Sequence, residues 1–131
     1  MATKEFPTTV VMSAVSGFLM CDFPLVHEFC EFMAGEPVWT HQLPRVGREA
    51  QAAFLRQHPD KRWAIDLCDT VNKDNYQAVA DRLIDEIGPM IAVHSMGDEE
   101  HERIDPVSEL AEQVHPSKII PVVVAAKKEL S

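Results

Sequence analysis

Three side chains that are close in the sequence could bind a metal ion: Cys21, His27 and Cys30, with Glu31 beside them. Thiolate, imidazole and carboxylate groups are the usual zinc ligands. His27, Cys30 and Glu31 fall within about one helical turn. Structural zinc sites normally combine two short ligand spacings, whereas this pattern has only the single pair His27 and Cys30. A cysteine on an apolar helix face is usually a small buried hydrophobic residue. The pattern therefore favours a core cysteine, and no metal or cofactor is predicted.

A catalytic nucleophile is the next possibility, because Cys68 lies between Asp66 and Asp69 and six histidines could act as bases. Two neighbouring carboxylates raise the pKa of a thiol, which disfavours the reactive thiolate. The G-x-S-x-G motif of serine hydrolases does not occur. Acidic residues are so abundant that no carboxylate pair stands out as a hydrolytic one. No catalytic residue is predicted, and the favoured interpretation is a protein that is not an enzyme.

The segment from Trp39 to Arg45, WTHQLPR, has the composition of a recognition site. It combines an aromatic ring, hydrogen-bonding side chains and a cation where a loop meets a helix, and backbone N–H groups point outward at such a junction. A structural interpretation also fits: Thr40 would cap the helix, Trp39 would pack beneath it and His41 would form a local hydrogen bond. The candidate binding residues of this junction are Trp39, Thr40, His41, Gln42, Arg45 and Arg48.

The charge of the chain is acidic and unevenly distributed. The formal net charge is −9, with 21 Asp and Glu residues against 12 Lys and Arg residues. Such a surface disfavours direct binding to nucleic acid, which requires cations that neutralise phosphates. Residues 40–62 are rich in arginine, whereas residues 81–112 hold ten acidic residues against Arg82 and Arg103. The candidate binding residues of the acidic region are Asp98, Glu99, Glu100 and Glu102.

Two elements are expected before residue 36. Residues 8–15 are rich in β-branched side chains and Ser16-Gly17 supplies a turn, so the pattern predicts a β-hairpin with residues 18–20 as its short second arm. A helix follows, because Asp22 is a typical N-cap, Pro24 lies in the first turn and Gly35 fits the C-terminal cap. Its apolar residues recur at spacings of three and four: Leu25, Val26, Phe29, Phe32 and Met33.

Two further helices are expected in the middle of the chain. The first runs from about Leu43 to Gln57, with Thr40 as its cap and His58-Pro59 as its end. The second follows a cap at Asn72 or Asp74 and ends at Gly88-Pro89. Residues 60–72 suit a strand, a helical turn or a packed loop equally well. The apolar stripe of the second helix is Tyr76, Val79, Ala80, Leu83, Ile84 and Ile87.

The last third of the chain predicts two strands, a loop and a short helix. Residues 90–96 have the length and composition of a strand, and residues 97–105 are too charged to be buried. Asp105-Pro106 opens a helix that reaches about Val114. The segment Lys118 to Ala126 forms a last strand, and its proline at position 121 places it at a sheet edge or a bulge.

Together these elements predict one α+β domain over residues 1–131. A small, mostly antiparallel sheet, made of the N-terminal hairpin and two later strands, would be covered by three to four helices. Residues 1–7 and 127–131 would be loose tails. An odd number of cysteines, the absence of an export signal and the absence of a long apolar run predict a cytoplasmic protein without a membrane span.

Several short motifs resemble a known family. They are S-x-V-S-G-x-L-M-C, H-E-x-x-E-x-M-x-G-E, T-H-Q-L-P-R and L-R-Q-H-P, and they lie within about residues 9–59. The family consists of short, functionally uncharacterised proteins encoded by tailed phages and prophages. The resemblance implies a phage or prophage origin and no particular activity. The residues that it places in the recurring pattern are Gly17, Gly35, Thr40, His41, Gln42, Pro44 and Arg45.

The leading hypothesis is a small acidic accessory protein of a phage or prophage that binds a host or phage protein in the bacterial cytoplasm. It would inhibit or modulate a host factor or a defence component by electrostatic complementarity. An alternative is a protein that binds or hydrolyses a small ligand, with His41, Arg45 and Arg48 around a nucleotide or other anion. A third hypothesis is a homo-oligomer that pairs through the edge strand Lys118 to Ala126.

Overall fold

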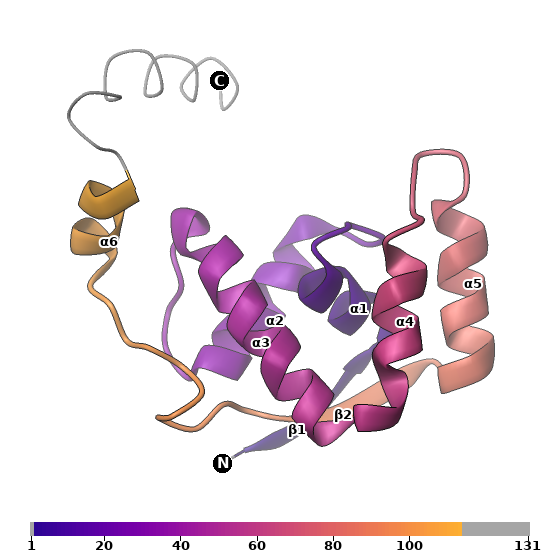
Figure 1. Cartoon of the computed structure of the whole chain (residues 1–131), viewed down its shortest axis with the longest axis horizontal. Helices are drawn as coiled ribbons and strands as arrows, with labels where there is room; N and C mark the ends of the chain where they lie inside the picture. The colour runs from indigo at the N-terminus through magenta and orange to yellow at the C-terminus, as the bar shows by residue number, and fades with distance from the viewer. Residues whose placement is uncertain (1, 114–131) are drawn as a thin grey trace.

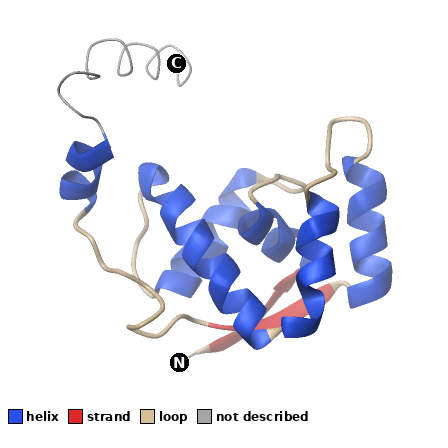
Figure 2. Cartoon of the chain, in the orientation of Figure 1, coloured by secondary structure: helices blue, strands red, loops and turns tan. Residues whose placement is uncertain are grey.

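The computed structural model describes residues 2–113, which form an α+β fold (Figure 1, Figure 2). The fold class predicted from the sequence is therefore confirmed. In chain order the elements are β1 (Thr3–Pro7), α1 (Thr8–Ser16), α2 (Phe23–Ala34), the 3₁₀ turn η1 (Thr40–Gln42), α3 (Leu43–Gln57), the 3₁₀ turn η2 (Pro59–Lys61), α4 (Arg62–Cys68), α5 (Tyr76–Ile87), β2 (Met90–His94) and α6 (Pro106–Gln113).

Helix α1 lies at the centre of the fold and contacts α2, α3, α4, α5 and both strands (Figure 1). A helix that is buried on all sides belongs to the interior of a domain rather than to its surface. The surrounding helices each turn their own apolar side chains toward it, so that one hydrophobic core forms around α1. The buried residues of α1 are Thr8, Val10, Val11, Met12, Ser13, Ala14 and Val15.

The hairpin predicted over residues 8–20 is wrong, because residues 8–16 form this central helix. Since α1 is buried on all sides, it lacks the one-sided apolar stripe that identifies a helix. It is also rich in β-branched residues, which is the composition of a buried strand. Gly17 has φ +82° and caps α1, with its N–H donating to the carbonyl of Ser13 at 3.0 Å. The residue expected to make a hairpin turn therefore ends a helix instead.

Strands β1 and β2 pair antiparallel, in register from Thr3 opposite His94 to Pro7 opposite Met90. Residues 1–7 were predicted as a loose tail, and this is wrong for residues 3–7, which form β1. The strand predicted over residues 90–96 is confirmed as Met90–His94. The strand predicted from Lys118 to Ala126 and the tail predicted at 127–131 lie outside the described residues.

Helices α2, α3 and α5 form where the sequence predicted them, and α3 has the predicted bounds Leu43 and Gln57. Their caps differ in part: Gly35 ends α2 with φ +69°, but neither α2 nor α3 has a side-chain hydrogen bond at its N-cap. Thr40 begins η1 rather than capping α3, and Asn75 is the N-cap of α5. The undetermined segment 60–72 contains the last two residues of η2 and all of α4, which buries Ala64, Ile65 and Cys68.

Residues 97–113, which we call the strap, run from β2 past the start of α3 to helix α6 (Figure 1). Helix α6 confirms the predicted short helix, and Asp105 Oδ2 accepts the N–H of Ser108 at 3.1 Å, as expected for its cap. Residues 97–105 form a loop as predicted, but His101 within it is buried, contrary to the expectation of full exposure. Among residues 2–113, no helix has the length and apolar character needed to cross a membrane.

Candidate functional site

The junction between α2 and α3, residues 39–49, presents two different faces because successive residues of a helix point in different directions. Gln42, Arg45 and Glu49 turn toward the strap and form hydrogen bonds with it. Pro44, Gly47 and Arg48 instead line hollows in the surface on the side of α1. We call these the strap face and the groove face of the junction.

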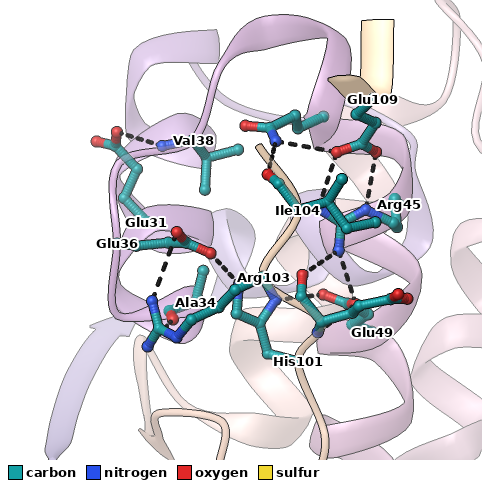
Figure 3. Close-up of polar contacts among 12 residues, drawn as sticks. Glu31, Ala34, Glu36, Val38, Arg45, Glu49, His101, Arg103, Ile104 and Glu109 are labelled. Carbon is teal, nitrogen blue, oxygen red and sulfur yellow. Dashed lines mark hydrogen bonds and ion pairs between the residues drawn. The ribbon is translucent and has the colours of Figure 1, made fainter. Parts of the chain in front are cut away.

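Arg45 is the centre of the strap face (Figure 3). Its Nε donates to Glu109 Oε2 at 2.8 Å and its Nη2 to Glu109 Oε1 at 2.9 Å, a two-point ion pair. Its Nη1 donates to Glu49 Oε2 at 2.9 Å and to the backbone carbonyl of Glu102 at 2.7 Å. Four of the five N–H donors of this guanidinium are therefore used in contacts within the chain.

Gln42 and His41 extend this set of contacts. The buried Gln42 donates through Nε2 to Glu109 Oε1 at 2.9 Å and to the carbonyl of Ile104 at 3.1 Å. Its Oε1 accepts the N–H of Trp39 at 3.0 Å, which fixes the chain just before η1. His41 Nε2 lies 2.8 Å from the carbonyl of Pro106. The junction therefore binds the strap at three points, the carbonyl of Ile104, the carbonyl of Pro106 and the carboxylate of Glu109.

A second polar contact ties the strap to α2 and α3 through the buried side chain of His101 (Figure 3). Its Nδ1 lies 2.6 Å from Glu49 Oε1, and its Nε2 lies 2.5 Å from Glu36 Oε2. Arg103 Nη1 also approaches Glu36 Oε1 at 3.5 Å. Because Glu49 contacts both Arg45 and His101, the two contacts form one continuous network.

The contacts between Arg45 and Glu109, the two-point ion pair of this network, favour the charged form of both side chains. The hydrogen bonds from Arg45 hold the pKa of Glu109 below its ordinary value, with a further contribution from Gln42. The hydrogen bond to Glu109 likewise raises the pKa of Arg45. Glu109 is only 4% exposed, so its charge depends on these donors rather than on water.

The groove face borders an open cavity of about 400 Å³. Most of its lining is apolar, and the floor includes the small residues Ala14, Gly17 and Gly47. A Cβ atom on Gly47 would lie 3.4 Å from the carbonyl oxygen of Ala14, so α1 and α3 approach closely there. Leu19 and Phe23 line the same cavity although they are 52% and 42% exposed. A smaller hollow of about 160 Å³, lined in part by Arg48, shares this floor.

The structure divides the predicted binding residues of the junction into two groups. Gln42, Arg45 and His41 bind the strap, so their contacts are structural, but His41 contacts the distant Pro106 and does not form the local hydrogen bond that the structural interpretation expected. Trp39 is 51% exposed, and its ring meets the His41 ring edge-on at a centroid distance of 5.9 Å. Thr40 and Arg48 are exposed and line the cavity and the smaller hollow, respectively.

The predicted acidic residues also divide into two groups. Glu100 accepts hydrogen bonds from the Gly97 N–H and from Arg56, and these contacts lower its pKa. Asp98, Glu99 and Glu102 are exposed, and within residues 2–113 their carboxylates have no ion-pair partner. These three carboxylates are the part of the acidic set that is available to a partner.

The three cysteines do not form a reactive or metal-binding group in the described part of the chain. Burial raises the pKa of Cys30 to about 12 and that of Cys68 to about 11, so both are thiols at neutral pH. His27 Nε2 is 2.5 Å from the carbonyl of Val38 and donates its hydrogen there. Across residues 2–113, no three histidine, cysteine or acidic side chains have an arrangement that could hold a metal ion.

Sequence reasoning missed the most connected members of the site: Glu36, Glu49, His101 and Glu109. Only Glu49 carried a local signal, because it follows Arg45 by four residues and such pairs face each other on a helix. Glu109 is 64 residues from Arg45 in the chain, so its pairing depends on the tertiary fold.

Comparison with known proteins gives one partial match. Residues 6–62 match the profile of a family described as a domain of unknown function, DUF7736. This region runs from β1 to the start of α4, so it contains the junction and the groove but not the strap. No curated protein and no solved structure matches the chain.

Proposed function

We propose that this chain is a small acidic accessory protein of a phage or prophage that acts by binding another protein in the host cytoplasm. Its partner is a host or phage protein, and binding inhibits or modulates a host factor or a defence component. The observation that carries the proposal is the apolar cavity beside the junction, with Leu19 and Phe23 exposed at its edge. Exposed apolar side chains that gather around a hollow are typical of protein-binding surfaces.

The shape of the cavity suits a protruding apolar side chain of a partner. Its lining combines the small residues Ala14 and Gly47 with the exposed side chains of Leu19 and Phe23, so a partner side chain that enters it would contact both of these large residues. Burial of a leucine or an aromatic ring contributes roughly 1.5–3 kcal/mol, which is the size of a binding hot spot. Thr40 supplies a hydroxyl at the edge for one hydrogen bond.

The charge of the molecule predicts the character of the partner. With a net charge of −9 and three available carboxylates in the strap, the surface attracts a basic protein. Such attraction accelerates association and is weakened by salt. In the free protein Glu109 and Glu49 occupy the guanidinium of Arg45, so a nucleotide phosphate would meet these two carboxylates there. The observations therefore favour protein binding over a nucleotide pocket.

A pull-down from bacterial lysate tests the proposal. The tagged wild-type chain should enrich one protein, and the variant Leu19→Asp should lose it, because a carboxylate at the cavity edge opposes apolar burial. Tyr76→Asp is the matched control, since Tyr76 is also exposed but lies on α5. Equal enrichment by all three chains would contradict a role for the cavity.

The same pull-down has an electrostatic arm. The triple variant Asp98→Asn, Glu99→Gln, Glu102→Gln should capture less of the partner at low salt and differ less from wild type at high salt. A variant with the same charge change on another surface, Asp74→Asn, Asp81→Asn, Asp85→Asn, is the control. Equal losses in both triple variants would assign the effect to net charge alone.

A further inference from the structure

Helix α6 is attached to the rest of the fold in an unusual way. A surface helix normally buries its apolar side chains and exposes its charges. Among the α6 side chains that the structure describes, residues 106–111, the buried one is Glu109, whereas Val107 and Leu110 are 62% and 42% exposed. In this part of the chain the helix is therefore held by polar contacts of Glu109 and the Pro106 carbonyl more than by hydrophobic packing.

The contacts between the strap and the junction resemble those between a bound peptide and its receptor. The carbonyls of Ile104 and Pro106 accept hydrogen bonds from Gln42 and His41, and the Glu109 carboxylate follows in the next turn. That carboxylate receives three donors, two from Arg45 and one from Gln42. In peptide recognition, hydrogen bonds to backbone carbonyls fix the position of the peptide, and a two-point contact to a carboxylate selects an acidic residue.

We propose that His41, Gln42 and Arg45 form a binding site for an acidic peptide segment, which the strap residues 104–109 occupy in the free protein. A partner segment that offers two carbonyls and a carboxylate at the same spacing replaces the strap and releases α6. This inference goes beyond the proposed function, because it concerns the strap face of the junction and stands whether or not the groove face binds a protein.

Release of the strap requires little loss of apolar burial. Val107 and Leu110 are already exposed, so freeing α6 uncovers little hydrophobic surface. The Glu109 carboxylate would regain water, while Arg45 would keep its ion pair with Glu49 at 2.9 Å. Elements held by a few polar contacts open at a lower free energy than the core. The strap is thus suited to exchange with a competing segment.

The receptor and its occupant also belong to different parts of the chain. His41, Gln42 and Arg45 lie within the region that matches the domain family, and residues 104–109 lie outside it.

A binding experiment with a synthetic peptide tests this inference. The probe is a fluorescent peptide of residues 102–113, ERIDPVSELAEQ, and its counterpart with glutamine at the position of Glu109. The full chain with Glu109→Gln should bind the first peptide at least about tenfold more tightly than the wild-type chain does, because its own strap competes poorly. It should bind the glutamine peptide at least about tenfold more weakly than the first. Fluorescence anisotropy measures both affinities.

Absence of binding to a folded Glu109→Gln chain, or equal binding of the two peptides, would overturn the proposal. A second measurement does not depend on that variant folding. In the wild-type chain, a large excess of the acidic peptide should shift the backbone amide resonances of residues 107–113, and the glutamine peptide should not. Unchanged resonances with the acidic peptide would show that the strap is a permanent part of the fold. Neither measurement involves Leu19, so its outcome is separate from that of the pull-down.

Discussion

Replacing Phe29 by alanine should lower the free energy of unfolding by about 3–5 kcal/mol. Phe29 on α2 is completely buried, and its ring meets that of Phe6 edge-on at a centroid distance of 5.1 Å. Removing the ring loses its burial and leaves a cavity between α2 and β1 that the close-packed core cannot fill. Chemical denaturation followed by circular dichroism measures the change.

The control for this prediction is Phe23→Ala on the same helix. Phe23 is 42% exposed, so its truncation should cost about 1 kcal/mol or less. Since domains of this size are stable by about 5–15 kcal/mol, the first variant should approach its unfolding threshold at ambient temperature while the second remains folded. Similar losses for the two variants would contradict the assignment of Phe29 to the core.

Replacing Arg45 by alanine should lower the free energy of unfolding by about 1–3 kcal/mol and detach the strap. The substitution leaves Glu109 with Gln42 as its remaining donor and leaves Glu49 without its cation. Loss of one partner of a buried ion pair typically costs about 3–5 kcal/mol, but α6 can move and return Glu109 to water. Hydrogen exchange should therefore show faster exchange at the amides of residues 107–113 than in the wild-type chain.

Two comparisons separate this effect from a general weakening. Arg48→Ala, an exposed arginine on the same helix, should change stability by about 0.5 kcal/mol or less. The second comparison uses acid. Because the pKa of Glu109 is lowered in the folded state, the stability that its ionised carboxylate contributes is fully present above the unfolded-state pKa of about 4.3. This stability is lost as the pH falls through the folded-state pKa. The Arg45→Ala chain should lose less stability over this acid range than wild type. An identical acid dependence would rule out the ion pair as the stabilising contact.

Local signals predicted the amphipathic helices correctly. α3 begins at Leu43 and ends before the His58-Pro59 stop, as predicted, and its apolar residues at helical spacing are all buried: Val46, Ala50, Ala53 and Phe54. In α5 the same reasoning placed Val79, Ala80 and Leu83 in the core, although Tyr76 and Ile84 proved to be exposed. A one-sided apolar stripe identifies a helix because one face meets the core and the other meets water.

The central helix and the sheet were not predictable from the same signals. α1 packs against apolar neighbours on every side, so the spacing of its apolar residues does not identify it as a helix. Its valines have a high β-strand propensity and favour a strand instead. β1 was missed because its partner β2 lies about 90 residues later in the chain, with Thr3 opposite His94. The contrast shows that sequence patterns report local amphipathic structure and not the pairing of distant segments.

The candidate site shows the same limit. Composition indicated that the segment from Trp39 to Arg45 was special, and the structure assigns most of it to contacts within the chain. Its partners, above all Glu109 and His101, are ordinary acidic-loop residues in the sequence. The cavity edge formed by Leu19 and Phe23 was also not foreseen, because residues 18–20 were taken for a strand.

The central claim, that a partner protein docks at this cavity, is tested most directly by photo-crosslinking in bacterial cells. A photo-reactive amino acid is introduced in place of Leu19, which lines the cavity, and separately in place of Tyr76 on α5. Illumination should give one crosslinked protein from position 19 and none of it from position 76. The same crosslinked protein from both positions, or none from position 19 in cells where the chain is folded, would contradict the claim.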